Sequence, residues 1–135
     1  MNSINYNCLN QLIEENPFLN SLGVQLVKFE MGKVVIELPV APNLINRQEV
    51  VHGGVLATML DNIIALTIRS ILDFPVSTIS LNINYLANIG EGKLVATAKI
   101  LQQGYRIVSG EGEITDETGK LLAKGSATFK IMRNS

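Results

Sequence analysis

The chain has few side chains from which a reactive centre can be built. Among its 135 residues there is no tryptophan, one cysteine and one histidine. The single cysteine, Cys8, excludes an internal disulfide and a cysteine-rich zinc cluster. A metal site needs several converging ligands, and His52 has no neighbouring cysteine or aspartate to join it. A Gly-x-Ser-x-Gly elbow is also missing. We therefore expect no metal and no redox cofactor.

The chain also lacks an excess of either charge. It has 11 basic and 12 acidic residues, a formal net charge of −1, and no basic stripe. This balance argues against a nucleic-acid partner. The longest apolar run, residues 55–72, contains Asp61 and Arg69, which argues against a membrane-spanning helix. The first residues have neither the basic nor the apolar part of a signal peptide, so we expect a cytoplasmic protein with no membrane partner.

What the chain has in quantity is apolar residues. Hydrophobic residues make up 47% and charged residues 17%, and the mean hydropathy is +0.26. These values predict a well-packed core and apolar surface that is buried against another copy of the chain. No linker, repeat or low-complexity tract divides the sequence, so we predict a single domain over residues 1–135, with 1–20 as an N-terminal helical extension that includes a short helix over 8–15.

The order of predicted elements indicates an α+β fold. Two strands, a loop over 41–51 and one long, mostly apolar helix over 54–72 are followed by four strands. An antiparallel sheet curled around a central helix satisfies this order. In the strand after the helix, alternation predicts Thr78 and Ser80 on one face and Ile79 and Leu81 on the other. The predicted strands are 24–30, 33–40, 76–86, 93–102, 105–115 and 121–132.

The start of the long helix is the first candidate for chemistry. Two glycines in His52-Gly53-Gly54 allow a ligand to approach the backbone closely. The first amides of a helix have no internal acceptor and lie at the positive end of the helix dipole, so they can polarise a carbonyl or hold an oxyanion. The alternative interpretation is a glycine-rich turn with ordinary capping.

Asp61 is the second candidate, because a carboxylate inside an apolar helix is unfavourable unless it is solvated or paired. The alternative is a polar stripe that faces water, with an interaction between Asp61 and Arg69. Gly53 and Asp61 are eight residues apart, about 12 Å along one helix, so they cannot both touch one substrate carbonyl. If both are catalytic, a second chain must complete each site, as a twofold dimer with antiparallel helices would do.

These residues together carry a resemblance. Asn46, then His52-Gly53-Gly54, then Asp61-Asn62, resembles the hot-dog-fold acyl-CoA thioesterases of the phenylacetate-pathway (PaaI-like) type. The strand that begins at Thr78, the Gln103-Gly104 turn and the stretch 118–125 are also similar to that family, and the resemblance spans about residues 22–130.

The resemblance implies an activity and a set of roles. It implies hydrolysis of acyl-CoA, with Asp61 as nucleophile or as the general base that activates water. The Gly53 amide would polarise the thioester carbonyl, Asn46 would position water or substrate, and Thr78 would assist from the adjacent strand. His52 and Gly54 would shape the substrate-binding loop. The family is at least dimeric and commonly a dimer of dimers, which implies a homotetramer with sites shared between subunits.

The sequence departs from the family in the segments that would bind the nucleotide. Many relatives have an acidic residue where this chain has Ser80, and a basic residue where it has Tyr105. Arg106 is the candidate contact for a CoA phosphate, with a solvated strand residue as the alternative. Two other functions stay open: a hot-dog hydratase or dehydratase that uses His52, and a non-catalytic acyl-CoA binding module. We also expect Leu56, Leu60 and Ile64 to line the acyl chain at the dimer interface.

Overall fold

Six antiparallel strands form one sheet around a long helix in the computed structural model, which describes residues 16–133. The sheet order is β1-β2-β4-β5-β6-β3, so β1 and β3 are its edges. The predicted α+β class is confirmed, and the predicted helix over 8–15 lies outside the described residues. The elements are α2 (Pro17–Leu22), β1 (Gln25–Glu30), β2 (Lys33–Pro39), the 3-10 helix η1 (Pro42–Leu44), α3 (Gly53–Arg69), β3 (Val76–Tyr85), β4 (Lys93–Gln103), β5 (Ile107–Thr115) and β6 (Leu121–Ile131).

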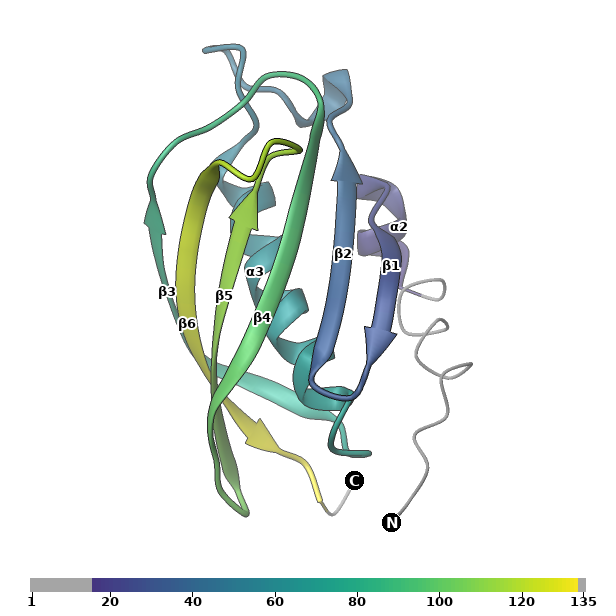
Figure 1. Ribbon diagram of the computed structural model, residues 1–135, viewed down its shortest axis with the longest axis vertical. Coiled ribbons are helices and arrows are strands. Elements are labelled where there is room, and N and C mark those ends of the chain that lie inside the picture. The colour runs from purple at the N-terminus through teal and green to yellow at the C-terminus, as the bar shows by residue number, and fades with distance from the viewer. Residues whose placement is uncertain (1–15, 134–135) are drawn as a thin grey trace.

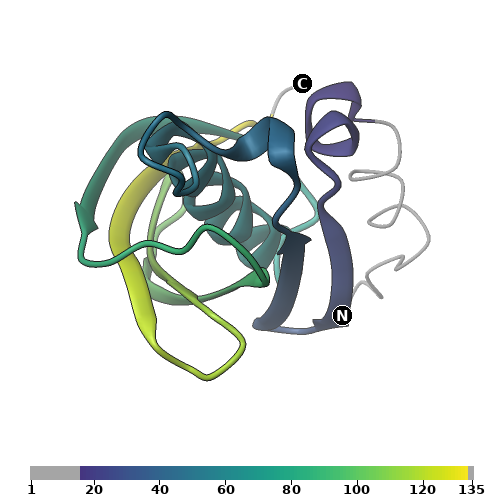
Figure 2. The same ribbon diagram turned by 90° about the horizontal axis from the view of Figure 1, so that it is seen from above.

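The sheet curls around α3, which lies on its concave face (Figures 1 and 2). Met59, Ile63 and Ile68 of this helix are fully buried, and each such side chain stabilises the fold by about 1.5–3 kcal/mol. The close approach depends on glycine: a Cβ on Gly110 would lie 2.7 Å from a methyl carbon of Ile64. The helix therefore packs almost directly against the backbone of β5.

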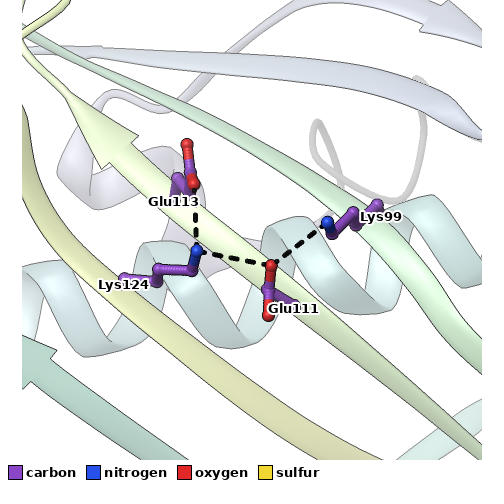
Figure 3. A network of polar contacts seen from close by, with 4 residues as sticks. All are labelled: Lys99, Glu111, Glu113 and Lys124. Atoms are coloured by element: carbon purple, nitrogen blue, oxygen red, sulfur yellow. Dashed lines mark ion pairs between the residues drawn. The ribbon is translucent and has the colours of Figure 1, made fainter.

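The middle of the sheet's outer face carries charged side chains. Outward positions of β4, β5 and β6 carry four charged side chains that form a network (Figure 3): Lys99, Glu111, Glu113 and Lys124. Each of the three ion pairs in it spans 3.5 Å. Inward and outward residues alternate along β5, since Val108 and Ile114 are buried while Glu111 and Glu113 face outward. This alternation is the pattern expected of an antiparallel sheet with one solvated face.

A β-bulge in β3 corrects the predicted facing of Thr78. Thr78 pairs with Phe129 and Ser80 pairs with Thr128, so Ile79 is an extra residue between two ladder positions. Directly opposite residues share a face, and Phe129 is buried in the core. Thr78 therefore faces the helix, while Ser80 faces outward. The prediction that both lie on one face was wrong, because simple alternation does not allow for a bulge.

Two predicted boundaries also need correction. The long helix ends at Arg69 rather than residue 72, because the hydroxyl of Ser70 caps the end by donating to the Thr67 carbonyl and accepting from Gly32 N at 2.9 Å. β5 begins at Ile107, so Arg106 lies in the turn after β4 rather than in a strand. Among residues 16–133, none of the helices has the length and apolar content that a bilayer crossing requires.

The sequence prediction missed the helix α2. Asn16 caps it by accepting hydrogen bonds from Phe18 N and Leu19 N, each at 3.1 Å, and Pro17 occupies its first position. Proline is favoured at that position, because the first turn of a helix has no acceptor for its N–H. Gly23 ends the helix with φ +92°. These are ordinary helix signals, and they lie just after the short helix that we predicted over 8–15.

Candidate active site

Asp61 and Thr78 form the one direct contact between two predicted site residues. The Thr78 hydroxyl donates a hydrogen bond of 2.8 Å to Oδ1 of Asp61. Asp61 is half-buried in the middle of α3, and Thr78 reaches it because the β3 bulge turns its side chain toward the helix. No described residue donates to the second carboxylate oxygen, Oδ2. One oxygen is therefore held in place, and the other is available to a ligand.

The alternative pairing of Asp61 with Arg69 was wrong. Arg69 instead lies 3.9 Å from Asp73, one turn further along the chain, and its Nε is buried without a partner among the described residues. The other two residues of the polar stripe on α3, Thr58 and Asn62, bond to their own helix: Thr58 donates to the Gly54 carbonyl and Asn62 to the Thr58 carbonyl. Of Thr58, Asp61 and Asn62, Asp61 is therefore the one that forms a hydrogen bond with a side chain of the sheet.

The start of α3 presents two free backbone donors. His52 is the N-cap and its ring makes no capping hydrogen bond. The first helical amide to find an intramolecular acceptor is that of Val55, which donates to the His52 carbonyl at 3.0 Å. Within residues 16–133, neither Gly53 N–H nor Gly54 N–H has an acceptor. Both donors lie at the positive end of the helix dipole, where they can stabilise negative charge.

The fold does not require glycine at these two positions. Neither residue has a positive φ. A Cβ on Gly53 would make ordinary contact with the Tyr85 ring at 3.5 Å, and one on Gly54 would have nothing within 4 Å. Glycine at a helix position destabilises it by roughly 0.5–1 kcal/mol relative to alanine. Because neither the backbone conformation nor the packing requires glycine at these positions, the two glycines fit a surface that a ligand or another molecule approaches closely.

Asn46 lies in the loop that leads into α3 and is oriented by its own backbone contacts. Its Oδ1 accepts from Gln48 N at 2.9 Å and from Val50 N at 3.3 Å. Since both partners are donors, the side-chain oxygen is fixed and the Nδ2 amide is free to donate. The loop itself is held to the start of the helix by the bond from His52 N to the Leu44 carbonyl at 2.9 Å.

Tyr85 is a site neighbour that the sequence reasoning did not single out. Its hydroxyl donates to the Gly53 carbonyl at 3.3 Å, and its ring lies against Gly53. Alternation along β3 predicts that Tyr85 faces the helix, but the contact with Gly53 depends on how the strand crosses the helix. The edge strand β3 therefore contacts both candidate features of α3, Asp61 through Thr78 and Gly53 through Tyr85.

The remaining predicted residues are separated within one chain. Gly53 and Asp61 are eight residues apart on α3, about 12 Å along its axis. Arg106 lies in the β4–β5 turn, at the end of the molecule away from the start of α3 (Figure 1). The expected acyl lining was wrong, because Leu56, Leu60 and Ile64 are buried in the core of their own chain. Among residues 16–133, no group of three acidic, histidine or cysteine side chains is placed to hold a metal ion.

Comparison with known proteins identifies the family. A sequence model of the thioesterase superfamily matches residues 48–123, which contain the whole of α3, β3, β4 and β5. The chain belongs to the thioesterase superfamily. Its hot-dog fold, a curved antiparallel sheet around a central helix, is the fold of this superfamily, and its general activity is the hydrolysis of thioesters.

Two individual relatives agree with this assignment, and a solved structure has the same fold. Acyl-coenzyme A thioesterase 13 of Homo sapiens is 34% identical over 109 residues, which are 78% of this chain and 77% of that protein. The 1,4-dihydroxy-2-naphthoyl-CoA hydrolase of Listeria monocytogenes is 29% identical over 115 residues, which are 84% of this chain and 94% of that protein. The PaaI protein of the E. coli phenylacetic acid degradation operon has a TM-score of 0.87 at 20% identity, covering 94% of this chain and 92% of that one, which shows a shared fold.

Proposed function

We propose that this thioesterase hydrolyses an acyl-CoA to the free acid and CoA, with Asp61 as nucleophile or general base. The hydrogen bond from Thr78 to Asp61 Oδ1 is the observation that carries the proposal. It fixes the carboxylate and leaves Oδ2 to attack the thioester or to activate a water molecule. Two relatives named for CoA-thioester hydrolysis support acyl-CoA as the substrate class.

In this mechanism the Gly53 amide polarises the thioester carbonyl. Its N–H has no acceptor within the described chain and lies at the start of a 17-residue helix, so it favours the negative charge that develops on the carbonyl oxygen. Gly54 keeps the approach open and His52 shapes the loop. Asn46 donates through Nδ2 to the water or to the substrate. The leaving group is a thiolate, which departs without a metal or another cofactor.

The site is completed by a second copy of the chain. The 12 Å between Gly53 and Asp61 is too long for one carbonyl, and β3, which carries Thr78, is an open edge of the sheet. Ile79 and Leu86 at this edge are 56% and 57% exposed, which is unusual for large apolar residues. We therefore assign a homodimer as the minimum active unit and a dimer of dimers as the assembly, acting in the cytoplasm. Arg106 would bind a phosphate of the CoA moiety.

A hydrolysis panel tests the function. Short, long and aromatic acyl-CoAs are incubated with the protein and free thiol release is followed. We expect hydrolysis of at least one class and a loss of about 10²–10⁴-fold in kcat for Asp61→Asn, which keeps an oxygen for the Thr78 hydrogen bond. Asp73→Asn, at an exposed carboxylate just beyond α3, is the matched control and should retain activity.

Two further readouts separate the other functions. Full thiol release by Asp61→Asn would overturn the mechanism. Hydration leaves the thioester intact, so the hydratase is tested by following loss of the double bond of a 2-enoyl-CoA: an activity that His52→Ala loses and Asp61→Asn keeps would indicate a hydratase that uses the histidine. Tight binding of acyl-CoAs without any thiol release would indicate a binding module.

A further inference from the structure

The segment that follows β3 lies alongside the loop that leads into α3. Val51 N of the loop donates to the Ile89 carbonyl at 2.9 Å, and Nδ2 of Asn88 donates to the Val51 carbonyl at 2.6 Å. The two backbones are so close at the next contact that a Cβ on Gly90 would lie 2.1 Å from the Glu49 carbonyl oxygen. The segment after β3 therefore holds the loop backbone just before the start of the helix.

This holding segment is itself fixed to the sheet. Leu86 N and Ala87 N both donate to the carbonyl of Leu122 in β6, at 2.8 and 3.0 Å, and Leu122 is fully buried. Oδ1 of Asn88 accepts from the next backbone amide at 2.8 Å. Because the oxygen of this side-chain amide is used locally, its nitrogen is the end that reaches the loop. Asn88 thus links a rigid base on the sheet to the loop.

The peptide group between Val51 and His52 is fixed at both ends. Its carbonyl accepts from Asn88, and its N–H donates to the Leu44 carbonyl at 2.9 Å. The following peptide group is held at its own carbonyl, which accepts from the first turn of α3 at 3.0 Å. The N–H of that second group is the free donor of Gly53. Since each peptide group is planar, the direction of this N–H follows from the two planes.

The Val51 carbonyl depends on Asn88. Val51 has no exposed surface, and within residues 16–133 the side chain of Asn88 supplies the hydrogen bond to its carbonyl. A buried carbonyl without a donor is unfavourable, so loss of this bond would turn the peptide group toward another donor. The neighbouring Gly53 N–H would turn with it. An amide stabilises an oxyanion only when it points at the position where the charge develops.

From these contacts we infer that Asn88 is a positioning residue for the thioester carbonyl, because it acts through the Val51 carbonyl to orient the Gly53 N–H. The inference rests on the proposed function for the reaction and for the role of Gly53. Asn88 itself does not touch the reacting atoms. An interaction that improves only the stabilisation of the transition state appears in kcat, so loss of Asn88 should lower kcat and leave KM nearly unchanged.

The kinetic test uses two substitutions of Asn88. Asn88→Asp keeps the size and the Oδ1 acceptor but replaces the donor to Val51 with an acceptor. It should lower kcat for acyl-CoA about tenfold and change KM by no more than about twofold. Asn88→Ala removes the donor without adding a charge and should show the same pattern, which separates the lost bond from the added charge.

The matched control is Asn84→Asp, on the outward face of β3 opposite Lys124, which should retain the kcat of the wild type. Thermal melts establish that each variant is folded at the assay temperature.

The substrate carbonyl reports the orientation of the amide without turnover. Acyl-CoAs of the hydrolysis panel, labelled with ¹³C at the thioester carbonyl, are bound to Asp61→Asn and their infrared difference spectra are recorded. A hydrogen bond from Gly53 N–H lowers the carbonyl stretching frequency. We expect about half of this shift or more to be lost when Asn88→Asp or Asn88→Ala is added, and the whole shift to remain when Asn84→Asp is added.

The two readouts separate this inference from the proposed activity. An unchanged kcat in both Asn88 variants, or a carbonyl shift that they leave unchanged, would overturn the role of Asn88 even if the enzyme is active. A rise in KM with kcat retained would also overturn it, because Asn88 would then serve binding alone. A carbonyl shift that depends on Asn88, in a protein that hydrolyses none of the panel, would support the inference and count against the proposed function.

Discussion

The oxygen and the nitrogen of the Asn46 side-chain amide have different roles. A substitution that replaces only the nitrogen can therefore test them separately. Oδ1 holds the loop through Gln48 N and Val50 N, while Nδ2 is the group left for water or substrate. We predict that Asn46→Asp keeps the loop, since a carboxylate accepts the same two bonds, but lowers kcat/KM by about tenfold or more because the donor is gone. Thermal unfolding and thiol release measure the two effects separately.

The companion variant is Asn46→Ala, which removes both halves of the amide. It should lower the melting temperature as well as the activity, because two backbone donors of the loop lose their acceptor, at a cost of about 1 kcal/mol or more. If Asn46→Asp hydrolyses acyl-CoA as well as the wild type, the donor role of Nδ2 is wrong and Asn46 serves the loop alone.

Gly54 offers a prediction in which stability and activity move in opposite directions. An added Cβ would meet nothing within 4 Å in the chain, and alanine is favoured over glycine in a helix. Gly54→Ala should therefore raise the stability by roughly 0.5–1 kcal/mol while reducing hydrolysis, because the methyl group blocks the approach of the thioester. Thermal melts and the hydrolysis assay on the same sample are sufficient. A variant that is both more stable and fully active would show that nothing approaches this glycine.

Residue types alone indicated where chemistry lies, but not how the residues are connected. A carboxylate in an apolar helix is conspicuous in any sequence, and so Asp61 could be identified as a candidate. Its partner Thr78 was predicted only through the family resemblance, because it is 17 positions away and faces the helix only through a bulge. The contact of Tyr85 with Gly53 was missed for a similar reason, since it spans 32 positions and depends on strand placement.

At the scale of elements, the β3 bulge decides which hydroxyl can serve Asp61. Regular alternation would place Thr78 and Ser80 on the same face, whereas the observed register turns only Thr78 inward. We predict that Thr78→Val lowers kcat about tenfold by removing the bond to Asp61, and that Thr78→Ser retains most of the activity. Ser80→Ala should have no effect on kcat. An equal loss in Thr78→Val and Ser80→Ala would contradict the register of this strand.

The order and class of the elements were predictable because they follow from periodicity. The long apolar helix and the six strands were all predicted, since burial of one face or of a whole helix leaves a clear pattern. The errors lie where a local contact overrides that pattern. The helix was predicted to continue three residues past Arg69, where Ser70 caps it through its hydroxyl. Arg106 was predicted in a strand, but it lies in a turn whose backbone accepts a hydrogen bond from Ile131 of β6.

For the whole molecule, the main question is whether one chain can form a site by itself. The two ends of the proposed site, Gly53 and Asp61, are separated by more than two helical turns, and α3 is rigidly packed in the sheet. No side-chain motion can bring them together. The exposed apolar residues on the free edge of β3 give a second chain a place to bind, and an antiparallel arrangement of two copies would bring each Gly53 toward the partner's Asp61.

Mixing two inactive variants tests this arrangement. Gly53→Pro removes the amide donor without disturbing the helix, because proline is favoured at the first helical position and His52 already has ψ 136°, as a residue before proline prefers. Asp61→Asn removes the acid. Each variant alone should be nearly inactive. After subunit exchange in a 1:1 mixture, half of the dimers carry one chain of each kind, and one of their two sites is intact. The mixture should therefore recover about a quarter of the wild-type activity.

The controls make this result specific to shared sites. Differently tagged chains report by co-purification whether exchange occurred, and each variant taken alone through the same procedure gives the background. Gly53→Ala keeps the amide and has room for its methyl group against Tyr85, so it should be far more active than Gly53→Pro. If both residues act within one chain, every site in the mixture carries a defect. Exchange without any recovery would then mean that Gly53 and Asp61 do not act on the same substrate across the dimer.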